Sequence, residues 1–141
     1  MPAPLAPLVD RWRPDHFPPP LGRLVVPPGL RAFFVAGLAA GAEGPVLALV
    51  PGERDAEELA DDLALFTPLS LQLPAWETLP FEHVSPKVVT MARRAEARHR
   101  LREGDRGWVV VASVRAATQR VSPSSTDPVR VGRGRRSIGT A

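Results

Sequence analysis

Residues 46–66 read VLALVPGERDAEELADDLALF, and this stretch decides the fold class. Its apolar opening, residues 46–50, is rich in leucine and valine, which is typical of a buried strand. Pro51 and Gly52 then form a turn, and residues 53–66 place apolar side chains three and four positions apart, as an amphipathic helix does. That stripe consists of Ala56, Leu59, Ala60, Leu63 and Phe66. The pattern predicts a strand, a turn and a helix that buries one face.

The same alternation continues on both sides of this stretch. Short apolar runs predict further strands at residues 23–26, 70–73 and 108–112. Helical patterns fall at residues 29–42, 86–103 and 114–120. Strands that are apolar throughout and alternate with helices indicate a parallel sheet covered on both faces. We therefore expect an α/β domain of three layers with a mostly parallel sheet of about four strands.

Both ends of the chain depart from this pattern. Residues 1–20 hold seven of the 17 prolines, which predicts an irregular leader with at most one or two helical turns around residues 5–12. The last 13 residues are basic and carry few large apolar side chains, which predicts a disordered tail. The sequence thus divides into a leader at 1–20, an α/β domain at 21–128 and a tail at 129–141. We expect the first 15 and the last ten residues to be poorly ordered.

Composition excludes several classes of protein. The chain has no cysteine, so it has neither a disulfide framework nor thiolate chemistry. No apolar run approaches the roughly 18 residues needed to cross a bilayer, and the N-terminus lacks the basic start of a secretory signal. These features predict a cytoplasmic protein without a membrane partner. The net charge is +3, but the four arginines of the tail leave −1 for residues 1–128, so the folded part is not basic overall.

A phosphate-binding loop is not predicted at the turn before residues 29–42. Such a loop needs several glycines, a lysine and a serine or threonine. Here the turn contains Pro27 and Pro28, which donate no backbone hydrogen bond, and a single glycine. The sole lysine of the chain, Lys87, lies far along the sequence. The residues therefore predict no ATP hydrolysis by this segment.

Other residues with catalytic chemistry occur without the spacing that a site requires. His16, His83 and His99 are too far apart to form a two-histidine zinc motif on one helix. Glu77, Glu82 and His83 share one loop, where solvated side chains are the ordinary outcome. We predict no catalytic residue, no cofactor-binding residue and no metal ligand in this chain.

Arginine is concentrated on one predicted helix and in the tail. Arg94, Arg98 and Arg102 are four residues apart, so they would form one ridge along the helix. The tail contributes Arg130, Arg133, Arg135 and Arg136. Charges of this kind contact phosphates, although a charged helix face is most often simply solvated. We predict weak, salt-sensitive binding of nucleic acid that comes mainly from the tail.

Two blocks of the sequence resemble a known family. Residues 73–86 read LPAWETLPFEHVSP, an unusual order of prolines, tryptophan and carboxylates. After an arginine-rich helix, residues 108–121 read WVVVASVRAATQRV. Together the blocks resemble the N-terminal domain of the bacterial transcription-repair coupling factor, over roughly residues 21–131. The motif residues of the first block are Trp76, Glu77, Leu79, Pro80, Phe81, Ser85 and Pro86.

The resemblance implies a helicase-like first domain, with a degenerate phosphate loop, in a protein of transcription-coupled nucleotide excision repair. Members of the family are ATP-dependent DNA translocases, whose motor uses ATP and magnesium and lies in a later domain. They act on RNA polymerase stalled on DNA and recruit the excinuclease A subunit. The resemblance therefore implies an interaction and scaffold segment that has no catalysis and no cofactor of its own.

Two alternatives stay open. The first domain of the excinuclease B subunit is similar to the same blocks, which allows the first motor half of an ATP-dependent DNA helicase of that type. A free-standing small α/β binding protein is the other alternative. The family continues from a stretch like residues 128–131 into domains that contact excinuclease A and the polymerase, whereas residues 132–141 do not resemble family sequence. We therefore expect a truncated or frame-shifted fragment in which the contacting domains are absent.

Overall fold

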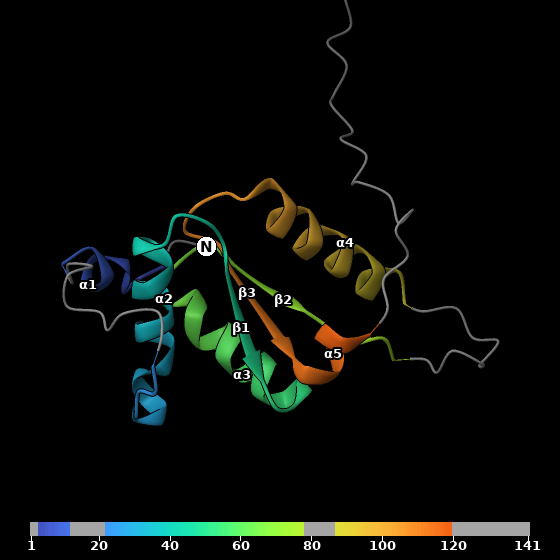
Figure 1. The fold of residues 1–141 in the computed structure, drawn as a ribbon, viewed down its shortest axis with the longest axis horizontal. Coiled ribbons are helices and arrows are strands. Elements are labelled where there is room, and N and C mark those ends of the chain that lie inside the picture. Colours follow the sequence, from blue (N-terminus) through green and yellow to red (C-terminus); the bar gives the residue numbers. More distant parts are fainter. Residues whose placement is uncertain (1–2, 12–21, 78–86, 120–141) are drawn as a thin grey trace, which may run out of the picture.

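The structure is a computed structural model that describes residues 3–11, 22–77 and 87–119. Helices cover both faces of a small sheet, as predicted for an α/β domain (Figure 1). In chain order the elements are α1 (Ala6–Arg11), the 3₁₀ helix η2 (Pro28–Leu30), α2 (Arg31–Gly41), β1 (Val46–Val50), α3 (Glu53–Ala64), β2 (Ser70–Leu73), α4 (Val88–Glu103), β3 (Val109–Ser113) and α5 (Val114–Thr118). The predicted domain boundaries near residues 20 and 128 lie outside the described ranges.

In the described residues the sheet contains three parallel strands in the order β1-β3-β2, so β3, which comes after the other two along the chain, lies between them. Val46 of β1 and Ser70 of β2 both pair with Val109 at the start of β3. Every residue of β3 is buried. Because β3 has a strand on each side and helices on both faces, its sequence is almost entirely apolar. Within the described residues, β1 and β2 are the two edges of the sheet.

Large apolar side chains fill the space between the sheet and helices α2 and α3. Leu63 of α3 is fully buried, and Val109 and Val111 of β3 face the same cluster. The rings of Phe33 and Phe66 pack edge to face with their centres 5.7 Å apart. The helical stripe predicted for residues 53–66 is confirmed, because all five of its members belong to this cluster or pack against it.

The opposite face of the sheet is covered by α4 and α5 and contains smaller side chains. Its buried cluster consists of Leu73, Ala75, Ala97, Val110, Ala112 and Ala116. Small residues allow a helix to approach the sheet closely, but each buries less apolar area than a leucine. This face also receives a buried charge, Arg94, which is 3% exposed.

Local signals explain where the helices begin and end. The Gly52 amide donates to Asp55 Oδ2 at 2.9 Å, and this bond satisfies a donor at the start of α3. Ser113 Oγ accepts from the Ala116 amide at 3.0 Å and caps α5. Gly104 ends α4 with φ of 73°, a left-handed conformation that glycine adopts without steric cost. The turn chemistry of the sequence thus places α3, α4 and α5.

The prediction of four strands is wrong. Residues 23–26 form no strand, and Leu24 and Val25 are exposed in an irregular segment. An apolar run becomes a strand only when a partner strand and a packed face are available to it. Here Pro27 and Pro28 follow at once and lead directly into η2, with no backbone donor of their own.

Residues 3–11, the part of the leader that the structure describes, are more structured than we expected, whereas residues 12–15 and the last ten residues lie outside the described ranges. The helical turns predicted around residues 5–12 are confirmed as α1. Val9 is buried in the α2 and α3 cluster, and the Leu5 amide donates to the Leu65 carbonyl at 2.8 Å. These contacts, which sequence periodicity does not show in so short a helix, fix α1 on the domain. No helix in the described ranges has the length and apolar character to cross a membrane.

Candidate functional site

The carboxyl ends of the three parallel strands lie together at one end of the sheet. We call this end the carboxyl edge, as distinct from the edge strands β1 and β2. β1 ends before the turn to Glu53, β2 ends before Pro74, and β3 ends at Ser113. In open α/β sheets this edge is where ligands bind, since the loops that follow the strands surround a crevice there. The side chains at this edge are therefore the first candidates for a functional site.

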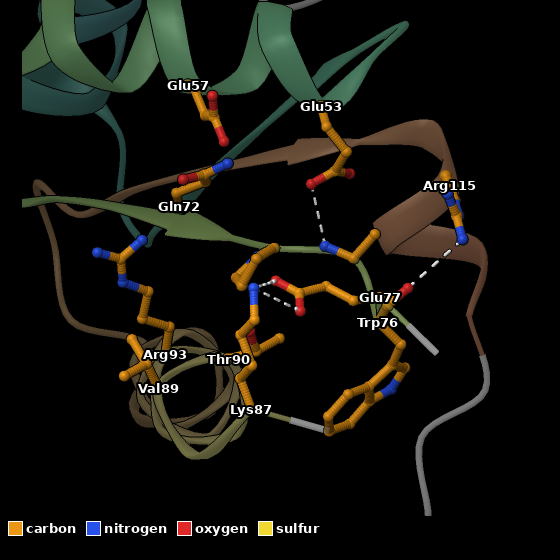
Figure 2. Close-up of a pocket in the computed structure, with 12 residues that line it drawn as sticks. Glu53, Glu57, Gln72, Trp76, Glu77, Lys87, Val89, Thr90, Arg93 and Arg115 are labelled. Carbon is orange, nitrogen blue, oxygen red and sulfur yellow. Dashed lines mark hydrogen bonds and ion pairs between the residues drawn. The ribbon is translucent and has the colours of Figure 1, made fainter. Parts of the chain in front are cut away.

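Glu53 joins three elements at this edge. It is the first residue of α3, and its Oε2 accepts from the Ala75 amide at 3.1 Å (Figure 2). Its other carboxylate oxygen accepts from the Ser113 hydroxyl at the end of β3. Ser113 in turn caps α5, so one carboxylate connects α3 to the ends of two strands. A negative charge at the start of a helix is also favourable because of the helix dipole.

Arg94 approaches the same edge from α4. Its Nη1 donates to the Pro74 carbonyl at 2.5 Å and to Gln119 Oε1 at 3.4 Å. Its Cζ lies 4.7 Å from the centre of the Trp76 ring, a cation–π geometry. Burial lowers the pKa of Arg94 below its ordinary value; the charge of Arg98 lowers it as well, and Glu53 opposes the shift. The guanidinium thus acts as a buried donor that connects α4 to the segment after β2.

The backbone of Trp76 completes the network. Its amide donates to Gln119 Oε1 at 2.7 Å, and its carbonyl accepts from Gln119 Nε2 at 3.4 Å. The same carbonyl accepts from Arg115 Nη2 at 3.5 Å. We call Glu53, Trp76, Arg94, Ser113 and Gln119 the edge network. It holds residues 74–76 in place by contacts from α3, from α4 and from Gln119, the residue that follows α5.

A cavity of about 370 Å³ lies beside the edge network, between α3, α4 and the end of β2 (Figure 2). Its wall carries carboxylates from Glu57 and Glu77 and cations from Lys87, Arg93 and Arg115. Lys87 Nζ lies 3.1 Å from a Glu77 oxygen, so part of this charge is already paired. The charged side chains of the lining are mixed in sign, so the cavity offers both donors and acceptors to a polar group.

Comparison with known proteins gives consistent matches. The chain is 36% identical over 118 residues to a transcription-repair-coupling factor of Mycobacterium tuberculosis, which covers 79% of this chain and 9% of the relative. It is 34% identical over 95 residues to the Escherichia coli protein of the same name, which covers 67% of this chain and 8% of the relative. This chain is related to the transcription-repair-coupling factors. The resemblance predicted from the two sequence blocks is thereby confirmed.

The relationship concerns a short part of the family proteins. The chain spans about 9% of the length of the curated relatives it matches. A third relative, from Myxococcus xanthus, is 34% identical over 101 residues and matches 66% of this chain. No protein-family profile matches the chain. The family relation therefore rests on sequence identity to a short segment of individual coupling factors.

Seven motif residues were named in residues 73–86 of this chain, and the structure describes two of them. Trp76 is half-buried in the edge network, and Glu77 is exposed and pairs with Lys87. The other motif residues, Leu79, Pro80, Phe81, Ser85 and Pro86, lie outside the described residues, as do Glu82 and His83. In the described ranges, no group of three or more His, Cys, Asp or Glu side chains is arranged to hold a metal ion.

The predicted arginine ridge is corrected by the structure. Arg94 is buried and donates to Pro74, so it does not present its charge to a phosphate backbone. Arg98 is half-buried, and only Arg102 of the three is exposed. Spacing of four places residues on one side of a helix, but in α4 that side turns partly into the domain. The tail arginines, Arg130, Arg133, Arg135 and Arg136, lie outside the described residues, and the predicted weak nucleic-acid binding by the tail stays a prediction.

Three residues of the edge network were missed by sequence reasoning. Glu53 and Ser113 look like ordinary helix-start residues, and Gln119 follows the last short helix. Their partners lie 22 to 60 residues away along the chain. The available signal was positional: each of the first two residues follows a predicted strand, at the edge where polar side chains converge.

Proposed function

We propose that this chain acts as a non-catalytic interaction and scaffold segment of a transcription-repair coupling factor in transcription-coupled nucleotide excision repair. The named relatives support the family part of this proposal. The scaffold part rests on one observation: the polar groups at the carboxyl edge of the sheet form hydrogen bonds within the chain itself.

At that edge the charged groups are engaged within the protein. Glu53 accepts from an amide and a hydroxyl, and Arg94 donates to a carbonyl and an amide oxygen. A ligand site requires donors and acceptors that are directed at the ligand, as in nucleotide-binding sheets. Here the same groups fix the relative positions of α3, α4, α5 and the strand ends. This arrangement favours the interpretation of the edge as a rigid surface for partners rather than as a reaction centre.

The start of α2 supports the same proposal. In a nucleotide-binding domain, a glycine-rich loop directs backbone amides and a lysine at the phosphates. In this chain Pro27 and Pro28 occupy the turn, and the Leu30 amide donates to the Pro27 carbonyl at 2.9 Å. This donor is used inside the turn, and two others are absent because the residues are proline. We accordingly propose that ATP and magnesium are used elsewhere in the family protein.

The partners follow from the family and are likewise proposals. For the complete coupling factor these are RNA polymerase, DNA and the excinuclease A subunit. The excinuclease B type helicase is not favoured, because the curated relatives given above are coupling factors. We propose that this segment supports the domains that make those contacts.

An exchange of segments tests the proposal. The matching segment of the Escherichia coli coupling factor is replaced by this chain, and removal of ultraviolet lesions from a transcribed strand is followed in cells. We expect the chimera to keep the faster repair of the transcribed strand. Loss of that preference, with the chimera present at the parent's level, would contradict the proposal. As a matched pair, Arg94→Ala should impair the chimera and Arg93→Ala should not, because only Arg94 belongs to the edge network.

A titration tests the absence of catalysis separately. The purified chain is titrated with ATP in the presence and absence of magnesium, and heat release is measured. We expect no saturable binding into the millimolar range. Micromolar, magnesium-dependent binding would instead support the helicase alternative. The two experiments fail independently, since a scaffold segment that binds ATP would still complement repair.

A further inference from the structure

The outer edge of β2 has backbone groups that pair with no other strand in the described part of the chain. Among the described strands, β2 pairs only with β3. The Leu69 carbonyl accepts from the Val109 amide at 2.8 Å, which fixes the side of the strand that faces β3. In a parallel ladder, successive residues direct their backbone groups to opposite sides. The amides and carbonyls of Ser70 and Gln72 therefore point away from β3, toward the free edge.

A groove runs along this edge. The cavity of about 370 Å³ described above is bordered by Gln72 and Arg93, and a second cavity of about 300 Å³ is bordered by the same two residues. The second cavity extends to Ser70 at the start of β2. Figure 2 shows Glu57 of α3 and Arg93 of α4 on opposite sides of Gln72. We call these two neighbouring cavities, which together extend from Ser70 to Trp76 between α3 and α4, the β2 groove.

The two walls of the β2 groove differ in charge. The α3 wall contains the exposed carboxylates of Glu57 and Asp61, which form no ion pair with another residue in the described part of the chain. The α4 wall contains Arg93 and Glu96, one charge of each sign. At the Trp76 end Lys87 is paired with Glu77, and Arg115 donates to the Trp76 carbonyl. Along β2 the groove is therefore acidic on the α3 side and balanced on the α4 side.

Small residues leave room for another backbone. Ala60 and Ala64 lie before and after Asp61 along the α3 wall, so that wall carries short side chains there. Pro68 precedes β2 and Pro74 follows it, which limits the edge to a few residues. A short, flat edge of this kind accepts one short extended segment, whereas a long open edge would favour aggregation.

We propose that the β2 groove binds an extended, basic peptide segment of a partner protein by strand addition. The added strand hydrogen-bonds with the backbone of Ser70 and Gln72. Its side chains alternate, so every second one faces the α3 wall, where lysine or arginine meets Glu57 and Asp61. The side chains between them face the balanced α4 wall and are neutral. The proposal goes beyond the scaffold function and does not depend on it.

The other edge of the sheet does not select such a partner. β1 exposes Leu47 and Leu49 on the face that carries α4 and α5, and both side chains are apolar. Apolar side chains favour neither a positive nor a negative charge in a bound segment. The β2 groove favours a positive charge, because Glu57 and Asp61, which form no ion pair within the described residues, line one of its walls.

A peptide titration of the full chain tests the proposal. The probe is a seven-residue peptide that alternates lysine and threonine, with lysine at both ends, because threonine favours strands. The control peptide has proline in place of the central threonine, which keeps the charge but removes one backbone donor. Binding is followed by nitrogen–proton NMR, and exchange of the Ser70 and Gln72 amides with solvent is measured. At saturation we expect both amides to exchange about tenfold more slowly, as newly hydrogen-bonded amides do.

Two double variants locate the charge contacts. Glu57→Gln with Asp61→Asn removes the carboxylates of the α3 wall, and we expect about fivefold weaker binding, the scale of two exposed ion pairs. Glu58→Gln with Asp62→Asn changes the net charge equally on the same helix but at the opposite cavity, where both residues border Pro28 and Arg31. All four side chains are exposed, so both variants should fold. The second variant should change the affinity by less than about twofold.

Three outcomes would overturn the proposal. Equal binding of the proline peptide would show attraction by charge without strand addition. Equal losses of affinity in the two double variants would show that the peptide is attracted by the charge of the whole helix and is not bound in the groove. Protection of Gln72 in the free chain, unchanged by the peptide, would show that the edge already has an occupant within this chain. Protection that appears only with the threonine peptide and weakens only in the first variant supports it.

Discussion

The two faces of the central strand β3 are held by different physical means. On the α2 and α3 side, Leu63 and the Phe33–Phe66 pair bury large apolar surfaces. On the α4 and α5 side the apolar residues are mostly alanine and valine, and the contacts of Arg94 with Pro74, Gln119 and Trp76 join the helices to the strand ends. The first face is stabilised by the hydrophobic effect, which has no direction. The second depends on directional bonds, so it also determines how the segment after β2 is placed.

The difference has a consequence for how each face tolerates change. Apolar packing accepts other apolar residues of similar volume at modest cost. A hydrogen-bonded charge does not, because loss of one partner leaves the others buried and unsatisfied. Substitutions on the first face should therefore reduce the free energy of unfolding, while substitutions on the second should in addition release residues 74–76. The following predictions test this distinction.

The largest loss is expected for Leu63→Ala on the apolar face. Leu63 is fully buried, so the substitution removes apolar burial and leaves a cavity. The free energy of unfolding should fall by about 3 kcal/mol, the usual cost for a buried leucine. Urea unfolding followed by circular dichroism measures it. Leu63→Met should recover most of the loss, and a cost for Leu63→Ala below about 1 kcal/mol would contradict the description of this face as the main core.

The next largest effect is expected for Arg94→Ala on the hydrogen-bonded face. The Pro74 carbonyl loses a charged donor and the Trp76 ring loses its cation, which should cost about 2 kcal/mol. Tryptophan fluorescence should shift to longer wavelength as Trp76 becomes more exposed, which Leu63→Ala should not cause in the folded state. Arg93→Ala, one position earlier and exposed, is the control. Equal costs for the two arginines would show that the edge network contributes nothing.

Ser113→Ala should cost about 1 kcal/mol, the ordinary value for loss of a helix cap. The Ala116 amide loses its acceptor, and one Glu53 oxygen loses a donor. Ser113→Thr keeps a hydroxyl and should recover part of the loss. Urea unfolding of both variants measures the difference. A cost as large as that of Leu63→Ala would mean that the two faces are not distinct in the way described.

The smallest effect is expected for Leu49→Thr on β1. Leu49 lies on the α4 and α5 side but is 55% exposed, because those helices cover mainly β2 and β3. The substitution should change the free energy of unfolding by less than about 0.5 kcal/mol, as is usual for exposed positions. A loss near that of Arg94→Ala would show that the second face has an apolar core which includes β1.

The same contrast explains what the sequence could predict. The α3 stripe is periodic, so its buried side followed from the spacing of Ala56 and Leu63. The buried residues of α4 are Thr90, Arg94 and Ala97, and periodicity of apolar residues does not detect two of them. Bonds such as Gln119 to Trp76 join residues 43 positions apart, and they depend on the sheet order, which local patterns do not contain.

The candidate site was predictable in part for the same reason. Trp76 was singled out by its proline-rich surroundings and does take part in the edge network. Arg94 was singled out for its spacing, but the expected exposure was wrong because α4 turns that position toward Pro74. Helical spacing fixes which residues share a side of a helix. It does not determine whether that side meets solvent or the domain.

The central place of β3 has a consequence for how the domain is made. β1 and β2 are translated first, but each pairs only with β3, within the sheet that the structure describes. As the chain leaves the ribosome, neither early strand has a partner until residues 109–113 have emerged. Helices α2 and α3 can meet sooner, since their contacts are closer along the chain. Each strand-to-strand hydrogen bond of the described sheet therefore waits for β3, and a ribosome that stops before Val109 holds α2 and α3 with β1 and β2 unpaired in that sheet.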